Sequence, residues 1–361
     1  MNNAKPVAVR CFSSGTGGME RSAVRLAGFL SSIADVTLVC KRGSFTEDLY
    51  SSEHGDYRCE SISFVSRIFS PSMLINARKI LARHNICNVI FFGASELKTL
   101  YFAFLGRELN LVVWHGTTKS RPKHDFIHRL VYSRVNYHVA ISNHLKNNVK
   151  KIVPPTENVE FRVIYPSFRI EAGSASAGQP GPDDKLRLVH IGRVADGKGQ
   201  IDAVQACAPL FSAGIDFRLD LVGPAGDDAY SRELKTVIEN SGYAGHIRLT
   251  GFVDDPSSYL ERADIFLFPS FGEGMPNAFI EALHYGIPCL AYANTVFPEF
   301  ISMGFHVTLA ADRDKTDLAD KLMTLAGQMT LEKQTSIANA GLAREYFDVQ
   351  REMADWREIL I

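Results

Sequence analysis

Residues 265–283 read IFLFPSFGEGMPNAFIEAL, and this stretch indicates more about the expected fold than any other. Its apolar start predicts a buried strand, residues 269–276 carry the glycines and prolines of a turn, and the apolar spacing that follows predicts a helix. Glu273 lies in the turn and Glu281 on the helix. The two carboxylates are therefore expected beyond the carboxyl end of a strand, where open α/β sheets bind ligands.

The backbone of this turn is a candidate anion site. Gly274, Met275 and Asn277 would present amide groups at the start of the helix, with Pro276 near its first turn. The alternative is that Glu273 and Glu281 only stabilise the helix N-terminus electrostatically. The position beyond a strand end favours a binding site.

The same alternation of short β-rich runs and helical periods extends along the whole chain. Strands are expected at residues 7–12, 36–40, 58–65, 89–92, 111–114, 138–141, 159–165, 186–191, 217–222, 247–250, 265–268, 288–291 and 307–309. In the first half, helices are expected at residues 19–31, 71–84, 96–107, 126–135 and 144–151. This alternation predicts an α/β protein with doubly wound parallel sheets.

Residues 171–184, EAGSASAGQPGPDD, interrupt the alternation and have the composition of a linker. They separate a first domain, residues 1–170, from a second, residues 185–343. Residues 344–361 form an amphipathic pattern that predicts a helix, which could pack on either domain.

Composition excludes several classes of protein. The 361 residues suffice for two domains, and 46% hydrophobic with 22% charged residues is ordinary globular usage rather than that of a disordered or fibrous chain. No apolar run approaches the roughly 20 residues of a membrane-spanning helix, and the N-terminus does not resemble a secretory signal. Six well-separated cysteines indicate a reducing, cytoplasmic compartment, and no zinc site is expected.

The net charge of −1 conceals two opposite halves. Residues 1–170 carry a formal charge of +11, and residues 171–361 carry −12. The basic half could face nucleic acid, an anionic membrane or a phosphate-bearing substrate. Recognition motifs for nucleic acid are absent from the sequence, so a nucleic-acid partner is not expected.

Three further loops are candidates for chemistry. Residues 13–18, SSGTGG, join a strand to a helix and form either an anion site that includes Gly17 and Gly18 or only a tight turn. Arg193 and Lys198 follow another strand and suit a diphosphate, although a solvated basic turn is the alternative. His115 ends a strand and could serve in catalysis or in structure.

Residues 119–151 are strongly basic, with Asp125 as their single acid. This pattern predicts either a solvated helix face or, as we favour, a face for anionic lipid or a phosphorylated acceptor. Its candidate members are Lys119, Arg121, Lys123, Arg129 and Lys146. A D-x-D sequence at residues 312–314 is better explained by loop and helix-start roles than by a metal.

The segment from Glu273 to Glu281 resembles the E-x7-E element of retaining glycosyltransferases of family four, which have the GT-B fold. Residues 17–21, 140–142, 192–199, 263–270 and 286–288 are similar to other motifs of that family, in the same order along the chain. The resemblance implies two Rossmann-like domains facing a central cleft. The first would bind the acceptor and the second the sugar nucleotide, with the final helix packing back on the first.

The resemblance also implies roles for single residues. Arg193 and Lys198 would hold the donor diphosphate, and Glu281 would hydrogen-bond the nucleotide ribose. Glu273 and the backbone after it would meet the transferred sugar, which His115 would also touch.

In the first domain, Gly18, beside Gly17, would approach the β-phosphate. The implied donor is a UDP- or GDP-sugar, and neither a metal nor another cofactor is implied. The negative charge of the departing diphosphate would be stabilised by cations and helix amides. At residues 303–306 the sequence departs from the family's usual Asn-Gly pair, which leaves the base and the sugar open.

The sequence is therefore interpreted as a retaining glycosyltransferase that extends a surface polysaccharide or lipopolysaccharide on a glycan or lipid-linked acceptor. It would be cytoplasmic and could meet the inner face of the cytoplasmic membrane. The alternatives are a nucleotide-sugar 2-epimerase-like isomerase and a catalytically silent nucleotide-binding scaffold of the same fold.

Overall fold

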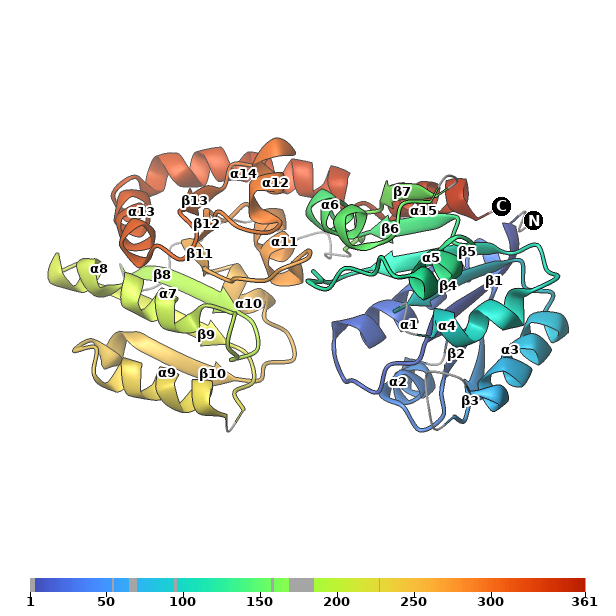
Figure 1. Cartoon of the computed structure of the whole chain (residues 1–361). Helices are drawn as coiled ribbons and strands as arrows, with labels where there is room; N and C mark the ends of the chain where they lie inside the picture. The colour runs from blue at the N-terminus through green and yellow to red at the C-terminus, as the bar shows by residue number, and fades with distance from the viewer. Residues whose placement is uncertain are drawn as a thin grey trace. The chain divides into compact units, whose positions relative to one another are not determined.

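A computed structural model describes residues 4–53, 55–64, 70–93, 96–156, 159–168, 185–226 and 228–360. The chain divides into two compact units, one formed by Met1–Pro166 with Gln350–Ile361 and the other by Ser167–Val349. Each unit is built on one parallel sheet (Figure 1). The predicted linker, residues 171–184, lies outside the described residues.

The sheet of the first unit has the strand order β3-β2-β1-β4-β5-β6-β7, with parallel pairing throughout. Its strands are β1 (Ala4–Cys11), β2 (Ala34–Lys41), β3 (Arg58–Ile62), β4 (Asn88–Phe92), β5 (Asn110–His115), β6 (Tyr137–Ala140) and β7 (Glu160–Val163). The helices are α1 (Gly18–Leu30), α2 (Phe45–Glu53), α3 (Pro71–Arg83), α4 (Leu97–Leu100), the 3₁₀ helix η1 (Tyr101–Phe104), α5 (Phe126–Tyr132), α6 (Asn143–Ile152) and the terminal α15 (Val349–Ile359).

The terminal helix α15 completes one of the two cores of the first unit. Trp356 and Ile359 are buried there with Val7 and Val9 of β1. At the rim of this core, Arg25 of α1 and Glu352 of α15 form an ion pair with a 2.8 Å separation. The end of the chain is therefore part of the first unit.

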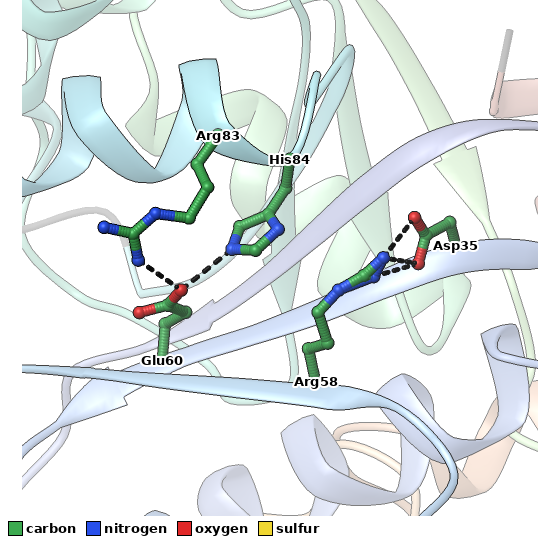
Figure 2. Close-up of polar contacts among 5 residues, drawn as sticks. All are labelled: Asp35, Arg58, Glu60, Arg83 and His84. Carbon is green, nitrogen blue, oxygen red and sulfur yellow. Dashed lines mark hydrogen bonds and ion pairs between the residues drawn. The ribbon is translucent and has the colours of Figure 1, made fainter.

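Two groups of ion pairs connect the edge strand β3 to β2 and to the end of α3 (Figure 2). Arg58 donates hydrogen bonds to Asp35 of β2, and Glu60 accepts hydrogen bonds from Arg83 and His84 at 2.9 and 2.8 Å. The bond from His84, followed by that from Arg83, lowers the pKa of the Glu60 carboxyl. Charged side chains on an edge strand also discourage pairing with another chain.

The sheet of the second unit has the order β10-β9-β8-β11-β12-β13. Its strands are β8 (Leu186–Ile191), β9 (Phe217–Val222), β10 (Ile247–Gly251), β11 (Ile265–Phe268), β12 (Cys289–Tyr292) and β13 (Thr308–Ala310). The helices are α7 (Gln200–Ala206), α8 (Ala208–Ser212), α9 (Ala229–Glu239), the 3₁₀ helix η2 (Ala244–His246), α10 (Ser257–Leu260), α11 (Asn277–His284), α12 (Phe297–Ser302), α13 (Lys315–Gly327) and α14 (Met329–Tyr346).

The α/β class and the two parallel-sheet Rossmann-like domains are confirmed, and every predicted strand is present with ends shifted by a few residues. The helix predicted at residues 96–107 is wrong in length. Only α4 and the tighter η1 form, because the aromatic residues of η1 are weak helix formers and Gly106 takes a φ of +74°.

The helix predicted at residues 344–361 is present as α15, but its start is wrong, because residues 344–346 belong to the end of α14 and the chain breaks between the two helices. Phe347 is buried there, and its carbonyl accepts a hydrogen bond from the amide of Phe168 rather than from a helical neighbour. The helix α2 had no prediction, since its sequence FTEDLYSSE has little apolar periodicity.

Candidate functional site

The turn after β11 is fixed from both ends. All four residues of β11 are buried, and Pro276 caps α11 with an extended backbone. Phe279, Ile280 and Leu283 bury one side of α11. A buried strand and a packed helix therefore hold residues 269–276 at the carboxyl edge of the second sheet.

Lys198 and Glu273 meet at this edge. The Lys198 Nζ lies 2.6 Å from the Glu273 Oε1, and the Ser270 hydroxyl donates to the same oxygen, also at 2.6 Å. Glu273 is only 9% exposed, so this carboxylate is held by charge-assisted bonds in a nearly buried place. Ser270 was not predicted from the sequence, because a serine after a proline carries no distinguishing signal.

The loop that carries Lys198 is shaped by glycine. Gly199 has a φ of +77°, and a Cβ added there would lie 1.9 Å from the Pro269 carbonyl oxygen. The Gly197 carbonyl accepts a hydrogen bond from the Phe271 amide at 2.8 Å. Close backbone approach thus ties the Lys198 loop directly to the turn of Glu273.

A buried histidine supports the same loop. His190 of β8 lies with its Nε2 2.9 Å from the Lys198 carbonyl, to which the ring N–H donates. Burial lowers the pKa of His190 to about 4, so the ring is neutral at physiological pH. His190 was not predicted as a site residue, although its place two residues before Gly192 in an apolar strand is the available signal.

Arg193 lies on the same loop but apart from the Lys198–Glu273 pair. Its side chain is exposed, and its carbonyl accepts a hydrogen bond from Gln200 at 3.0 Å. Asp228 is close enough to Arg193 for the guanidinium to contribute to the lowering of the Asp228 pKa, after the hydrogen bonds from Ser231. Arg193 is thus available to a ligand at the loop surface.

Glu281 is half-buried on α11. Burial, followed by the negative charge of Asp255, raises the pKa of its carboxyl. A carboxylate in such a place gains from a hydrogen-bond donor, such as a hydroxyl group of a ligand. The described structure shows no direct bond between Glu281 and Glu273.

The glycine turn of the first unit is partly filled by the protein itself. Gly17 caps α1, and its amide donates to the Glu20 carboxylate at 2.9 Å. Glu20 is buried, whereas Gly18 has open space around its Cβ position. The Gly18 side of the turn is therefore open to a ligand, whereas the Gly17 amide is already hydrogen-bonded to Glu20.

His115, at the end of β5, is buried against His138 of β6. Their rings share a hydrogen bond of 2.9 Å between His115 Nε2 and His138 Nδ1, and His115 Nδ1 has no partner among the described residues. Burial lowers the pKa of His115 well below its usual value and that of His138 to about 3. His115 can exchange hydrogen bonds but does not carry a positive charge near neutral pH.

The five basic candidates of the first unit differ in exposure. Lys119 and Lys123 are half-buried, and burial lowers the pKa of both, that of Lys119 to about 8. Arg121 and Arg129 are exposed, and Lys146 is intermediate. Burial therefore affects the charge of Lys119 and Lys123, whereas Arg121 and Arg129 face solvent.

The D-x-D sequence has structural roles. Asp314 caps α13 by accepting hydrogen bonds from the amides of Thr316 and Asp317, and Asp312 accepts one from Asn294. Within the described ranges, no group of three or more His, Cys, Asp or Glu side chains is placed to hold a metal. None of the described helices is both long and apolar enough to cross a membrane.

Comparison with known proteins finds similarity that is concentrated in the second unit. Residues 185–328 match the family model of the glycosyl transferases group 1. AmsK of Erwinia amylovora, an amylovoran biosynthesis glycosyltransferase, is 32% identical over 149 residues, which are 39% of this chain and 36% of AmsK. The chain spans 36–42% of the length of three curated relatives that include AmsK.

Two comparisons extend over both units. The N-acetylgalactosamine-N,N'-diacetylbacillosaminyl-diphospho-undecaprenol 4-alpha-N-acetylgalactosaminyltransferase of Campylobacter jejuni is 22% identical over 75% of this chain and 76% of its own. HepE of Anabaena, solved in complex with UDP, superposes with a TM-score of 0.82 at 19% identity over 99% of both chains. The fold is therefore the GT-B fold.

Proposed function

We propose that this chain is a glycosyltransferase that moves a sugar from a nucleotide-diphosphate sugar to a glycan or lipid-linked acceptor in surface polysaccharide or lipopolysaccharide biosynthesis. The Lys198–Glu273 pair carries the proposal, because it is built at the carboxyl edge of the second sheet, inside the residues that match the family model. The names of the relatives support a surface-glycan pathway.

The second unit, residues 185–343, is the proposed donor domain. Lys198 and the exposed Arg193 would bind the diphosphate, and the amides of Gly274, Met275 and Asn277 at the start of α11 would add positive potential. Glu281 would accept a hydrogen bond from the ribose. A UDP- or GDP-sugar is the proposed donor, and the UDP bound by HepE favours the first.

The proposed chemistry follows from where charge develops. As the glycosidic bond to the diphosphate breaks, negative charge grows on the leaving group, and Arg193, Lys198 and the helix amides stabilise it without requiring a metal. Lys198 would then turn from Glu273 towards the diphosphate. This would leave the Glu273 carboxylate beside the transferred sugar, whose anomeric carbon becomes positively charged as the bond breaks. We also propose that the reaction retains the anomeric configuration.

The first unit is the proposed acceptor domain. The buried His115 is neutral, so it would bind the transferred sugar by a hydrogen bond from its unpaired side rather than act as a charged acid. Gly18, with open space around it, would approach the β-phosphate.

We also propose that the exposed apolar side chains of helix α5 contact a membrane. Phe126 is 79% exposed, Ile127 and Leu130 are exposed beside it, and Arg129 lies on the same helix. Exposed apolar side chains flanked by cations suit the interface of an anionic bilayer, here the inner face of the cytoplasmic membrane. We expect Phe126→Ser to reduce flotation with phosphatidylglycerol vesicles, whereas Phe211→Ser on α8 serves as the matched exposed control.

Ligand-induced thermal stabilisation tests the donor site. A panel of UDP- and GDP-sugars is titrated against the wild type, Lys198→Ala and the control Lys185→Ala, which removes an exposed lysine paired to Asp216. A ligand at about 1,000 times its dissociation constant stabilises by about 4 kcal/mol. We expect stabilisation of the wild type and the control and its loss in Lys198→Ala; no stabilisation by any nucleotide sugar would contradict the proposal.

Incubation without an acceptor separates the proposal from its alternatives. An epimerase would convert the nucleotide sugar by itself, and a silent scaffold would bind it without turnover on any acceptor. The proposed transferase leaves the nucleotide sugar unchanged until an acceptor is added.

A further inference from the structure

Three cations and one carboxylate lie at the carboxyl edge of neighbouring parallel strands of the first unit, because Arg10 is near the end of β1, Glu96 follows β4, and Lys119 and Lys123 follow β5. Glu96 caps α4 and is 5% exposed, and its charge acts on Arg10 of β1 and on Lys119 and Lys123 of the loop after β5. Helix α4 packs beside α5 over this edge of the sheet (Figure 1). We name Arg10, Lys119 and Lys123 the inner cation cluster.

Arg10 is the most deeply placed member of the cluster. It is 5% exposed, and neither its Nη1 nor its Nη2 has a hydrogen-bond partner among the described residues. Its guanidinium lies 4.4 Å from the ring centre of Phe12 and 5.3 Å from that of Phe91. Burial lowers its pKa to about 9, and buried cations of this kind are costly unless an anion accompanies them.

The two lysines are held in place rather than free in solvent. The Lys119 backbone exchanges two hydrogen bonds with the Asn148 side chain, at 3.0 and 2.9 Å. The Lys123 Nζ donates to the Tyr132 hydroxyl at 3.0 Å. Both ammonium groups are therefore presented from a fixed loop at the carboxyl edge of a parallel sheet, where such sheets bind ligands.

Among the described residues, no neighbouring group other than Glu96 offsets the positive charge of the inner cation cluster. His115 and His138, which lie nearest on β5 and β6, are neutral, and the lysines themselves contribute to keeping them so. Three cations facing one carboxylate leave a charge of about +2, which matches a dianion such as a phosphate group better than a second carboxylate.

We propose that the inner cation cluster is an anion site in the first unit that binds a phosphate group, with Lys119 and Lys123 as its direct ligands and Arg10 as the buried charge behind them. In the proposed reaction this group belongs to the acceptor, and that assignment alone rests on the proposed function. The anion site is distinct from the donor diphosphate site of the second unit.

The distribution of tryptophan makes this site separately measurable. The chain has two tryptophans, Trp114 and Trp356, and both lie in the first unit. Trp114 precedes His115 on β5, next to the loop of Lys119. Titration of the Lys198→Ala chain with sodium pyrophosphate, followed by tryptophan fluorescence, reports the first unit while the donor site is disabled.

We expect a saturable fluorescence change that Lys119→Gln and Lys123→Gln each weaken by about tenfold or more, as loss of a charge-assisted bond predicts. Lys79→Gln is the matched control, since it removes one exposed lysine charge from α3 of the same unit and should change the affinity less than about twofold. Circular dichroism checks that each variant is folded.

Parallel titrations with inorganic pyrophosphate and with dihexanoyl phosphatidic acid identify the source of the phosphate group. Tighter binding of phosphatidic acid than of pyrophosphate indicates a lipid headgroup. Either response, if both lysine variants weaken it, supports the site. No saturable response to either probe up to about 10 mM, or equal affinity in the Lys119 and Lys123 variants and in Lys79→Gln, would overturn it. Failure of the donor proposal appears instead in the nucleotide-sugar panel, which does not probe this cluster.

Discussion

Among single residues, the proposed donor site depends on backbone positions that only glycine fills well. Gly197 and Gly199 flank Lys198 and both take positive φ values, but they differ in surroundings. No atom lies within 4 Å of a Cβ at Gly197, whereas a Cβ at Gly199 would overlap the Pro269 carbonyl. Alanine substitutions at the two positions therefore separate the free-energy cost of the positive φ from the cost of the steric overlap.

We expect Gly199→Ala to lower the free energy of unfolding by more than about 2 kcal/mol and to abolish nucleotide-sugar binding, since the turn of Glu273 must shift. Gly197→Ala is expected to cost about 1–2 kcal/mol, from its positive φ alone. Urea denaturation measures both. Equal costs for the two variants would show that the close approach to Pro269 does not position Lys198.

The sequence predicted Lys198, Glu273 and Glu281 as a donor site, and the structure brings the first two together. It did not predict Ser270 or His190, which orient them. A serine hydroxyl or a buried histidine gains its role from a partner, Glu273 or the Lys198 carbonyl, that only the folded loop brings within hydrogen-bond distance. No sequence motif encodes that partner.

Among the helices and strands, buried parallel strands were predictable because each is a short apolar run between turn residues. The ends of the chain were harder to predict. The break between α14 and α15 arises where Phe347 enters a buried aromatic group that includes Phe300 and Phe305, and that contact overrides helical continuity.

Helix α15 should stabilise the first unit strongly. Trp356 is 1% exposed, so Trp356→Ala is expected to lower the free energy of unfolding of that unit by about 3–5 kcal/mol. The remaining Trp114 reports the transition during urea denaturation. Leu331→Ala, at an exposed position of α14, is the control and should have almost no effect; a similarly small effect of Trp356→Ala would contradict the placement of α15 in the first unit's core.

For the molecule as a whole, the opposed charges of +11 and −12 are distributed between the two halves of the sequence, and the inner cation cluster and α5 both belong to the basic half. The donor diphosphate is proposed to bind in the acidic half. In this proposal, local cations and helix amides bind the diphosphate against the overall negative charge of that half, so net charge gives no indication of the donor side.

Buried histidines in both units predict a common sensitivity to acid. The pKa of His138 is lowered to about 3 and those of His190 and His284 to about 4, chiefly by burial. As the pH falls from about 6.5 towards 4, the unfolded chain takes up protons that the folded chain does not, so the free energy of unfolding decreases.

We expect urea denaturation to show this decrease between pH 7 and about pH 4.5. His284→Gln should make the pH dependence shallower, while His124→Gln, at an exposed position, should leave it as in the wild type. A slope that is unchanged by His284→Gln would mean that its burial does not contribute to acid sensitivity.

The transfer reaction itself is the decisive measurement for the proposed function. Radiolabelled UDP- and GDP-sugars are incubated with lipid-linked glycans from a cell that makes surface polysaccharide, and labelled product, released nucleoside diphosphate and the anomeric configuration of the product are measured together. We predict one-for-one transfer and release with retained configuration, abolished by Lys198→Ala and by Glu281→Ala. Unchanged turnover in both variants, or consumption of the nucleotide sugar with no labelled acceptor, would contradict the proposed function.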